Sequence, residues 1–184
     1  MLRSLRHQVL FASFCALALT ACASPSSSVF NLSSDSGAMG SQRRIVHLTI
    51  GDVSIPKDLD RPQMVSRINP NELKVDEFAR WSEPFGDMVQ RVLADDLAER
   101  LPHGSSVVSR RNQTSTGGTV IDIAITAFAY GPDNAVLLDA DWTIAGRSRH
   151  AHIVRPAAGG KAQDIAATMS AALGGLADEI ARQL

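Results

Sequence analysis

Apolar and polar residues alternate along two long stretches in the second half of the chain. Ile121, Ile123 and Ile125 alternate with polar or small residues inside 120–130, and the same period of two runs through 136–145. This pattern is typical of half-buried β-strands, and the Gly-Pro-Asp-Asn turn between the two runs predicts an antiparallel hairpin. Shorter strands are predicted from other apolar or alternating runs: 45–50, 64–68, 72–75, 106–110 and 149–155.

Two further stretches carry apolar residues every three or four positions, which is the spacing of an amphipathic helix. The first runs from 82 to about 101, with Ser82 expected as its N-cap and Pro84 in its first turn. The second runs from 164 to 184. Together these elements predict an α+β domain, in which a mostly antiparallel sheet has two amphipathic helices packed on one face.

The N-terminal part of the chain follows a different pattern. Residues 1–21 begin with basic side chains and continue with an unbroken apolar to small run over 9–19, which is the layout of an export signal. A helix over that run would cover only about half of the ~30 Å hydrocarbon core, so we do not expect a membrane span. Residues 22–42 are rich in Ser and Gly and are predicted to be a flexible tether, and 43–184 to be one folded domain.

The signal ends in Leu19-Thr20-Ala21-Cys22, which resembles the bacterial lipobox. The resemblance implies cleavage between Ala21 and Cys22, and acyl chains such as palmitate on Cys22, which becomes the first residue of the mature chain. Ala23 stands where an inner-membrane retention signal has Asp, which implies the periplasmic face of the outer membrane as the location. The alternative is an ordinary signal peptide with a cysteine near its cut by chance.

Charge and cysteine content narrow the possible functions. Arg3 and Arg6 leave with the signal, so 16 of the 18 basic residues face 19 acidic ones in the mature chain, a net charge of −3. That balance gives no reason to expect nucleic acid as a partner. Cys15 also leaves with the signal, and an acylated Cys22 has no free thiol. Disulfides, Cys-ligated zinc and thiol catalysis are therefore excluded for the domain.

Candidate chemistry is sparse, because the sequence has no Gly-x-Ser-x-Gly, no Gly-rich phosphate loop and no His-Glu-x-x-His. His150 and His152 lie two apart on a predicted strand, so both project to one face, which Asp139 and Asp141 would share. Two histidines and a carboxylate could hold a metal, and a His-based metal hydrolase is one hypothesis. We favour the alternative, a polar sheet face with cross-strand ion pairs and no metal, cofactor or catalytic residue.

Three segments around the first predicted helix point to a family. The sequences Leu-Asp-Arg-Pro-Gln-Met-Val-Ser-Arg over 59–67, Arg-Trp-Ser-Glu-Pro-Phe over 80–85 and Leu-Ala-Asp-Asp-Leu over 93–97 resemble the PqiC family of ABC-transport auxiliary lipoproteins. Ser82 stands where that family has Ala, and Phe85 where it has Leu. The order of lipobox, tether, loop, helix, strands and final helix matches the family along the whole mature chain.

The resemblance implies a non-enzymatic adaptor: an outer-membrane lipoprotein subunit of a Pqi-type system that moves lipids between two membranes and supports membrane integrity. The implied partners are an MCE-domain, PqiB-like subunit, the inner leaflet of the outer membrane, and further copies of the chain in a homo-oligomeric ring. The residue types before the helix fit a docking surface, with planar donors, acceptors and a stiff proline: Leu59, Asp60, Arg61, Pro62, Gln63, Arg67 and Trp81. The alternative is that Asp60 pairs with Arg61 to brace the loop, while Trp81 packs beneath it.

A second hypothesis for the function is a stand-alone periplasmic lipid-binding lipoprotein, which would hold an acyl chain between helix and sheet. Such a pocket would be lined by apolar residues of the predicted core: Phe85, Met88, Trp142 and Met169.

Overall fold

The computed structural model describes residues 26–37, 44–110 and 118–184. The predicted signal peptide, its cleavage site at Ala21 and the acylated Cys22 lie outside the described residues. No helix within these three ranges is both long enough and apolar enough to cross a membrane.

Two helices and eight strands make up the described fold. The helices are α2, Phe85–Arg100, and α3, Ala162–Ala181. The strands, in chain order, are β1 Ser28–Phe30, β2 His47–Ser54, β3 Gln63–Asn69, β4 Glu72–Trp81, β5 Ser106–Ser109, β6 Thr119–Tyr130, β7 Ala135–Ile144 and β8 Arg147–Pro156.

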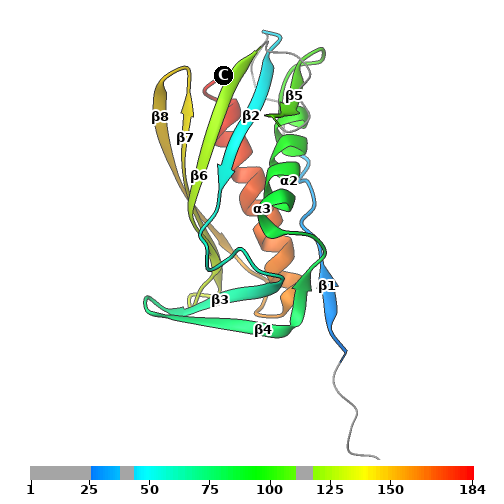
Figure 1. The fold of residues 1–184 in the computed structure, drawn as a ribbon, viewed down its shortest axis with the longest axis vertical. Helices are drawn as coiled ribbons and strands as arrows, with labels where there is room; N and C mark the ends of the chain where they lie inside the picture. The colour runs from blue at the N-terminus through cyan, green and yellow to red at the C-terminus, as the bar shows by residue number, and fades with distance from the viewer. Residues whose placement is uncertain (1–25, 38–43, 111–117) are drawn as a thin grey trace, which may run out of the picture.

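The strands form one sheet in the order β1-β4-β3-β6-β2-β5, and β7 and β8 continue it from β6 (Figure 1). Both helices pack on the same side of the sheet, so the predicted α+β class is confirmed. The sheet is mixed: β3–β4, β6–β7 and β7–β8 are antiparallel, whereas β2 runs parallel to β5 and β6. The chain passes through α2 between β2 and β5, and this crossover makes the pairing of these two strands parallel.

Both predicted hairpins are confirmed. β6 and β7 pair around the turn at 131–134, and β3 and β4 pair around 70–71. β4 runs further than predicted, to Trp81, past an irregularity in its pairing with β3. The Asp76 carboxylate accepts the backbone N–H of Phe78 at this irregularity (2.9 Å), which satisfies a donor that the ladder leaves free.

The boundaries of β2 and α2 also differ from their predictions, and α3 ends at Ala181, three residues before the predicted end. β2 continues beyond Gly51, because its pairing with β6 resumes at Val53 after an irregularity. At that irregularity the backbone N–H of Asp52 donates to the Asp122 carboxylate on β6 (3.0 Å). Ser82 is not the N-cap of α2, which begins at Phe85 without a side-chain cap. The Ser82 N–H instead donates to the Phe30 carbonyl (2.9 Å), since the chain still follows β1 at that point.

The core lies between the two helices and the inner face of the sheet. The apolar stripes predicted for the helices are buried there, and all members but one are at most 4% exposed: Phe85, Met88, Val89, Val92, Leu93, Leu97 and Leu101 on the first helix and its end, and Ile165, Met169, Leu173, Leu176 and Ile180 on the second. The exception is Leu184, which lies beyond the end of α3 and is partly buried. Ile121, Ile123 and Ile125 of β6 face them, as their alternation predicts.

The predicted tether over 22–42 is wrong for residues 28–37, which we call the N-terminal strap. β1 pairs with the end of β4 in the strap, and Leu32 is 0% exposed in the main core. The Leu32 backbone N–H also donates to the Met88 sulfur on α2 (3.2 Å). A single leucine between polar residues has no period, which is why composition alone indicated a tether.

We expect Leu32→Ala to lower the free energy of unfolding by about 2–5 kcal/mol, because it empties a closed site in the core. Val29→Ala is the matched control, since Val29 lies in the same strap with 64% of its surface exposed. Urea denaturation of both variants measures the difference. If Leu32→Ala costs no more than Val29→Ala, the strap is not part of the folded domain.

Candidate docking site

The loop between β2 and β3, residues 57–62, is fixed to the sheet, and we call it the docking loop. Leu59 is buried, and its backbone N–H donates to the Pro56 carbonyl (3.0 Å). The Arg61 N–H donates to the Leu59 carbonyl (2.8 Å). The Trp81 N–H donates to the Pro62 carbonyl (2.7 Å), which ties the loop to the end of β4. The loop is therefore ordered before any partner binds.

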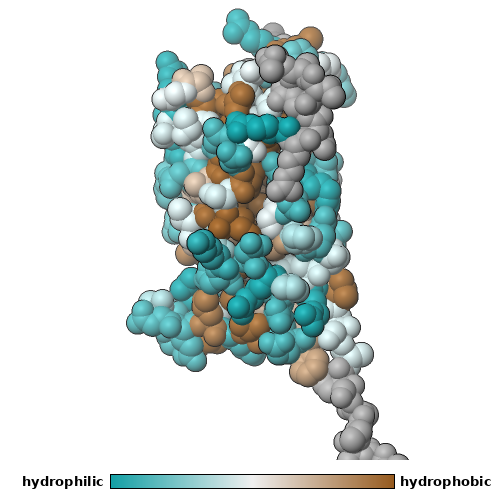
Figure 2. Space-filling model, viewed as in Figure 1, coloured by the Kyte–Doolittle hydropathy of each residue, from teal (hydrophilic) through white to brown (hydrophobic). Residues whose placement is uncertain are grey.

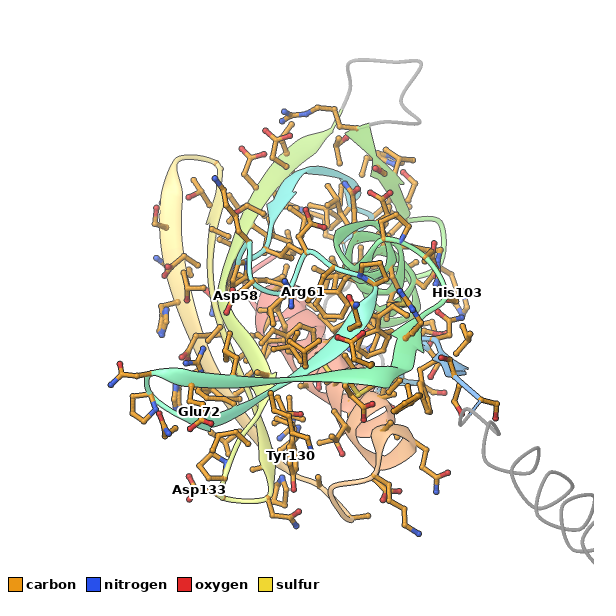
Figure 3. All side chains as sticks on the ribbon, turned by 60° about the horizontal axis from the view of Figure 1, so that its bottom comes forward. Asp58, Arg61, Glu72, His103, Tyr130 and Asp133 are labelled. Carbon is orange, nitrogen blue, oxygen red and sulfur yellow. The ribbon has the colours of Figure 1, made fainter. Side chains whose placement is uncertain are left out.

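Asp60 and Arg61 are the exposed charged pair at the centre of the predicted motif. Within the described part of the chain, neither side chain makes an ion pair or hydrogen bond, so the alternative that they brace the loop by pairing is wrong. Figure 3 shows Arg61 with Asp58 on the loop that leads into β3. Figure 2 shows hydrophilic side chains where this loop crosses the molecule, bordered by an apolar band. The pair is free to meet a partner.

Leu59 and Trp81 support the docking loop from below. Leu59 is 6% and Trp81 7% exposed, so both offer little surface to a partner. The Trp81 ring lies 5.0 Å from that of Phe85 at an interplanar angle of 31°, and Phe85 lies 5.7 Å from Phe128 of β6. The alternative that Trp81 packs beneath the loop is confirmed.

Gln63 and Arg67 of the predicted set belong to the β3–β4 hairpin. The Gln63 side-chain amide donates to Glu77 across the hairpin (3.2 Å), and Arg67 donates to the Pro70 carbonyl at its turn (3.3 Å). Both bonds stay within the hairpin, so the structure separates these two residues from the unpaired charges of the docking loop.

His150 and His152 pair across strands with the aspartates predicted to share their face. The Nδ1 atom of His152 lies 2.6 Å from the Asp139 carboxylate, and that of His150 lies 3.0 Å from Asp141. Both histidines are more than half exposed. No group of three or more His, Cys, Asp or Glu side chains with the arrangement needed for a metal ion was found in the described ranges. The four side chains form a polar sheet face.

The four residues predicted to line a lipid pocket instead pack in the core. Phe85, Met88, Trp142 and Met169 are each at most 3% exposed. The cavity beside Phe85 and Met169 has a volume of about 10 Å³, which is close to the smallest space that holds one water. An acyl chain does not fit there in this conformation.

A buried charge cluster beneath the N-terminal strap was not predicted from sequence. Asp96 and Arg100 of α2 are 0% and 1% exposed, although their spacing placed them off the apolar stripe. Asp96 accepts the Asp35 backbone N–H (2.7 Å), and Arg100 donates to the Asp35 carbonyl (2.9 Å) and to the Asp178 carboxylate of α3 (2.5 Å). The i,i+4 spacing of Asp96 and Arg100 is the one signal that could have found the pair.

Glycines make room for this cluster. A Cβ at Gly37 would collide with the Arg100 guanidinium, and one at Gly174 would lie 2.8 Å from the Asp35 Cβ. One carboxylate oxygen of Asp96 and one guanidinium nitrogen of Arg100 are buried without a hydrogen-bond partner in the described residues. The strap thus closes directly over charged groups in the gap between the two helices.

Comparison with known proteins shows the family to which this chain belongs. The model of the family described as "ABC-type transport auxiliary lipoprotein component" matches residues 30–181. The chain belongs to this ABC-type transport auxiliary lipoprotein family. The match begins inside the strap, in agreement with its place in the fold, and the family role is that of an auxiliary component of transport systems.

Two solved structures share the fold of this auxiliary lipoprotein at low sequence identity. One, described only as an uncharacterized protein, has a TM-score of 0.72 at 16% identity, over 86% of this chain and 99% of its own. The other, XCC0632 from Xanthomonas campestris, assigned to DUF330, has a TM-score of 0.70 at 16% identity, over 85% and 94%. The PelC dodecamer from Paraburkholderia phytofirmans reaches a TM-score of only 0.40 at 12% identity, over 80% and 95%, which is too low to show a shared fold. A search of curated proteins found no match.

Burial raises the pKa of Asp96 to about 6 from an ordinary value of 3.8, although the Asp35 N–H and Arg100 lower it. The folded state therefore binds this proton more tightly than the unfolded chain. Stability is lost as pH rises from about 4 to 7, by roughly 2–3 kcal/mol for this group. Asp96→Asn lacks this titrating group. We therefore expect the difference in free energy of unfolding, wild type minus Asp96→Asn, to decrease by the same amount between about pH 4 and 7.

Asp95→Asn is the control for this measurement, because Asp95 is the neighbouring residue and its side chain is 56% exposed. Its difference from wild type should stay nearly constant with pH. Chemical denaturation at a series of pH values measures both differences. Parallel curves for wild type and Asp96→Asn would contradict the assignment.

Proposed function

We propose that this auxiliary lipoprotein is the lipid-anchored subunit of a Pqi-type intermembrane lipid transport system, where it binds an MCE-domain partner as a non-enzymatic adaptor. The observation that carries the proposal is the exposed Asp60–Arg61 pair, unpaired in the described structure, on a loop that is already ordered.

An ordered loop with unpaired charges is well suited to docking. Leu59 and the Pro62–Trp81 hydrogen bond hold the backbone, so little backbone entropy is lost when a partner binds. The Arg61 guanidinium offers planar donors to a carboxylate, and Asp60 beside it accepts from a cation. Two opposite charges at adjacent positions select a partner with the reverse arrangement, which favours specificity.

The proposed anchor is acylated Cys22 in the periplasmic leaflet of the outer membrane. The lipobox resemblance supports it, and two or more acyl chains on one residue give a lasting attachment. Because β1 begins at Ser28, only residues 23–27 connect Cys22 to the fold, and they reach at most about 20 Å. The β1 end of the domain would therefore sit close to the bilayer. A homo-oligomeric ring would present several docking loops to one partner.

We expect Arg61→Gln and Asp60→Asn each to reduce capture of the MCE-domain partner about tenfold or more, because each removes one side of the charge pairing. Lys57→Gln and Asp58→Asn are matched controls, since they remove the same charges from exposed positions of the same loop. Quantitative pull-down from crosslinked cells measures capture. Equal loss in all four variants would show that Asp60 and Arg61 have no special part in docking, and no loss in any would refute the docking role.

Cys22→Ser should leave an unprocessed precursor in the inner membrane, because no thiol remains to accept the acyl chains. Radiolabelled palmitate incorporation and membrane fractionation measure the result. Cys15→Ser, within the apolar run of the signal, is the control and should be processed and labelled like wild type. Normal processing of Cys22→Ser with outer-membrane localisation would contradict the proposed anchor.

A further inference from the structure

A pocket of about 470 Å³ opens at the end of the molecule where α3 finishes, the end marked C in Figure 1. Its walls come from the segment before β2, the start of β6, the β7–β8 turn and the last residues of the chain. Three of its lining residues are arginines: Arg44, Arg147 and Arg149. We call it the arginine pocket.

The alternation of side chains along β8 determines which face of the sheet these arginines occupy. Ala151 and Ile153 are buried on the helix-facing side of the strand. Arg147 and Arg149 precede Ala151 with the same spacing of two residues. They therefore lie on the same side of the strand, near its start. α3 ends at Ala181 and no longer covers the sheet there. The inner face of the sheet thus changes from apolar to cationic where its helical cover stops.

Acidic side chains of the described residues leave the positive charge of the pocket unpaired. No Asp or Glu side chain lines it, and none of its three arginines forms an ion pair within the described residues. The acidic residues on adjacent elements are paired elsewhere, Glu179 with Arg182 and Asp122 with Arg110. Three arginines therefore line one pocket without an acidic neighbour in its described lining, and guanidinium groups pair readily with phosphate.

The remaining lining is mixed: His47, Thr119 and Gln183 are polar, whereas an apolar part of it packs against the core. Val46 and Ile144 are partly buried and pack against the core cluster, and so does Leu184. An apolar surface contributes nothing to the binding of a free inorganic anion, whereas it can bind the acyl chain of an amphiphile. The pocket volume lies within the range of small-molecule sites.

We propose that the arginine pocket binds the phosphate head group of an anionic amphiphile, with the proximal part of its acyl chain against Ile144, Val46 and Leu184. This inference goes beyond the docking function and does not depend on it, because the docking loop follows the opposite end of β2. Loss of partner binding and loss of amphiphile binding are therefore separable.

Calorimetric titration of the full mature chain tests the proposal with three probes below their micelle concentrations. Dihexanoyl phosphatidylglycerol should bind, whereas glycerol phosphate, which lacks the chains, and octyl glucoside, which lacks the phosphate, should bind at least tenfold more weakly. Equal affinity for glycerol phosphate would show a free-phosphate site, and equal affinity for octyl glucoside a purely apolar one. Either result, or no binding of phosphatidylglycerol, would overturn the proposal.

Variants identify the site. Arg147→Gln with Arg149→Gln should weaken phosphatidylglycerol binding at least tenfold. Arg155→Gln, the same kind of substitution at a single position at the other end of β8, should leave it unchanged. Ile144→Ser should weaken phosphatidylglycerol but not glycerol phosphate. Circular dichroism confirms that each variant is folded. Unchanged affinity in the double variant would refute the assignment of the arginine pocket.

Discussion

The fold depends on covering one apolar sheet face with only two helices. Where α2 begins, the cover is completed by Leu59, Trp81 and Phe85, and the docking loop rests on them. In the gap between α2 and α3, the N-terminal strap supplies Leu32. Beyond the end of α3 the face is left open and its residues become arginines. Each special feature of the surface thus lies where helical cover is incomplete.

The strap closes its gap at an energetic cost, because it seals Asp96 and Arg100 away from water. A buried ion pair gains little over a well-packed apolar pair, but removing one partner leaves an uncompensated charge. Arg100 here contacts the strap, its own helix and Asp178 of α3, so one side chain joins three segments distant in sequence. We infer that the cluster contributes to the specificity of this arrangement more than to its stability.

Local patterns predicted much of this structure, and long-range contacts account for the rest. Alternating apolar and polar residues predicted β6, β7 and β8, and apolar residues at helical spacing predicted both helices. Both patterns lie within single segments of the chain. Parallel pairing of β2 with β5 and β6 leaves no local mark. Leu32 and Asp96 are single residues whose burial depends on what covers them. At the candidate site, the sequence identified the loop but did not divide it into buried supports, Leu59 and Trp81, and the exposed pair, Asp60 and Arg61.

The layout constrains how the two proposed sites would work together. β1 lies at the end of the molecule opposite the arginine pocket (Figure 1), so an anchor at Cys22 would turn that pocket away from its own bilayer. A pocket facing the periplasm cannot collect an amphiphile by resting on the membrane that holds the anchor. If both proposals hold, an amphiphile in that pocket would come from another component of the transport system. The docking loop would then bind the transport partner. The arginine pocket, at the far end of β2, would remain accessible to the amphiphile that the partner carries.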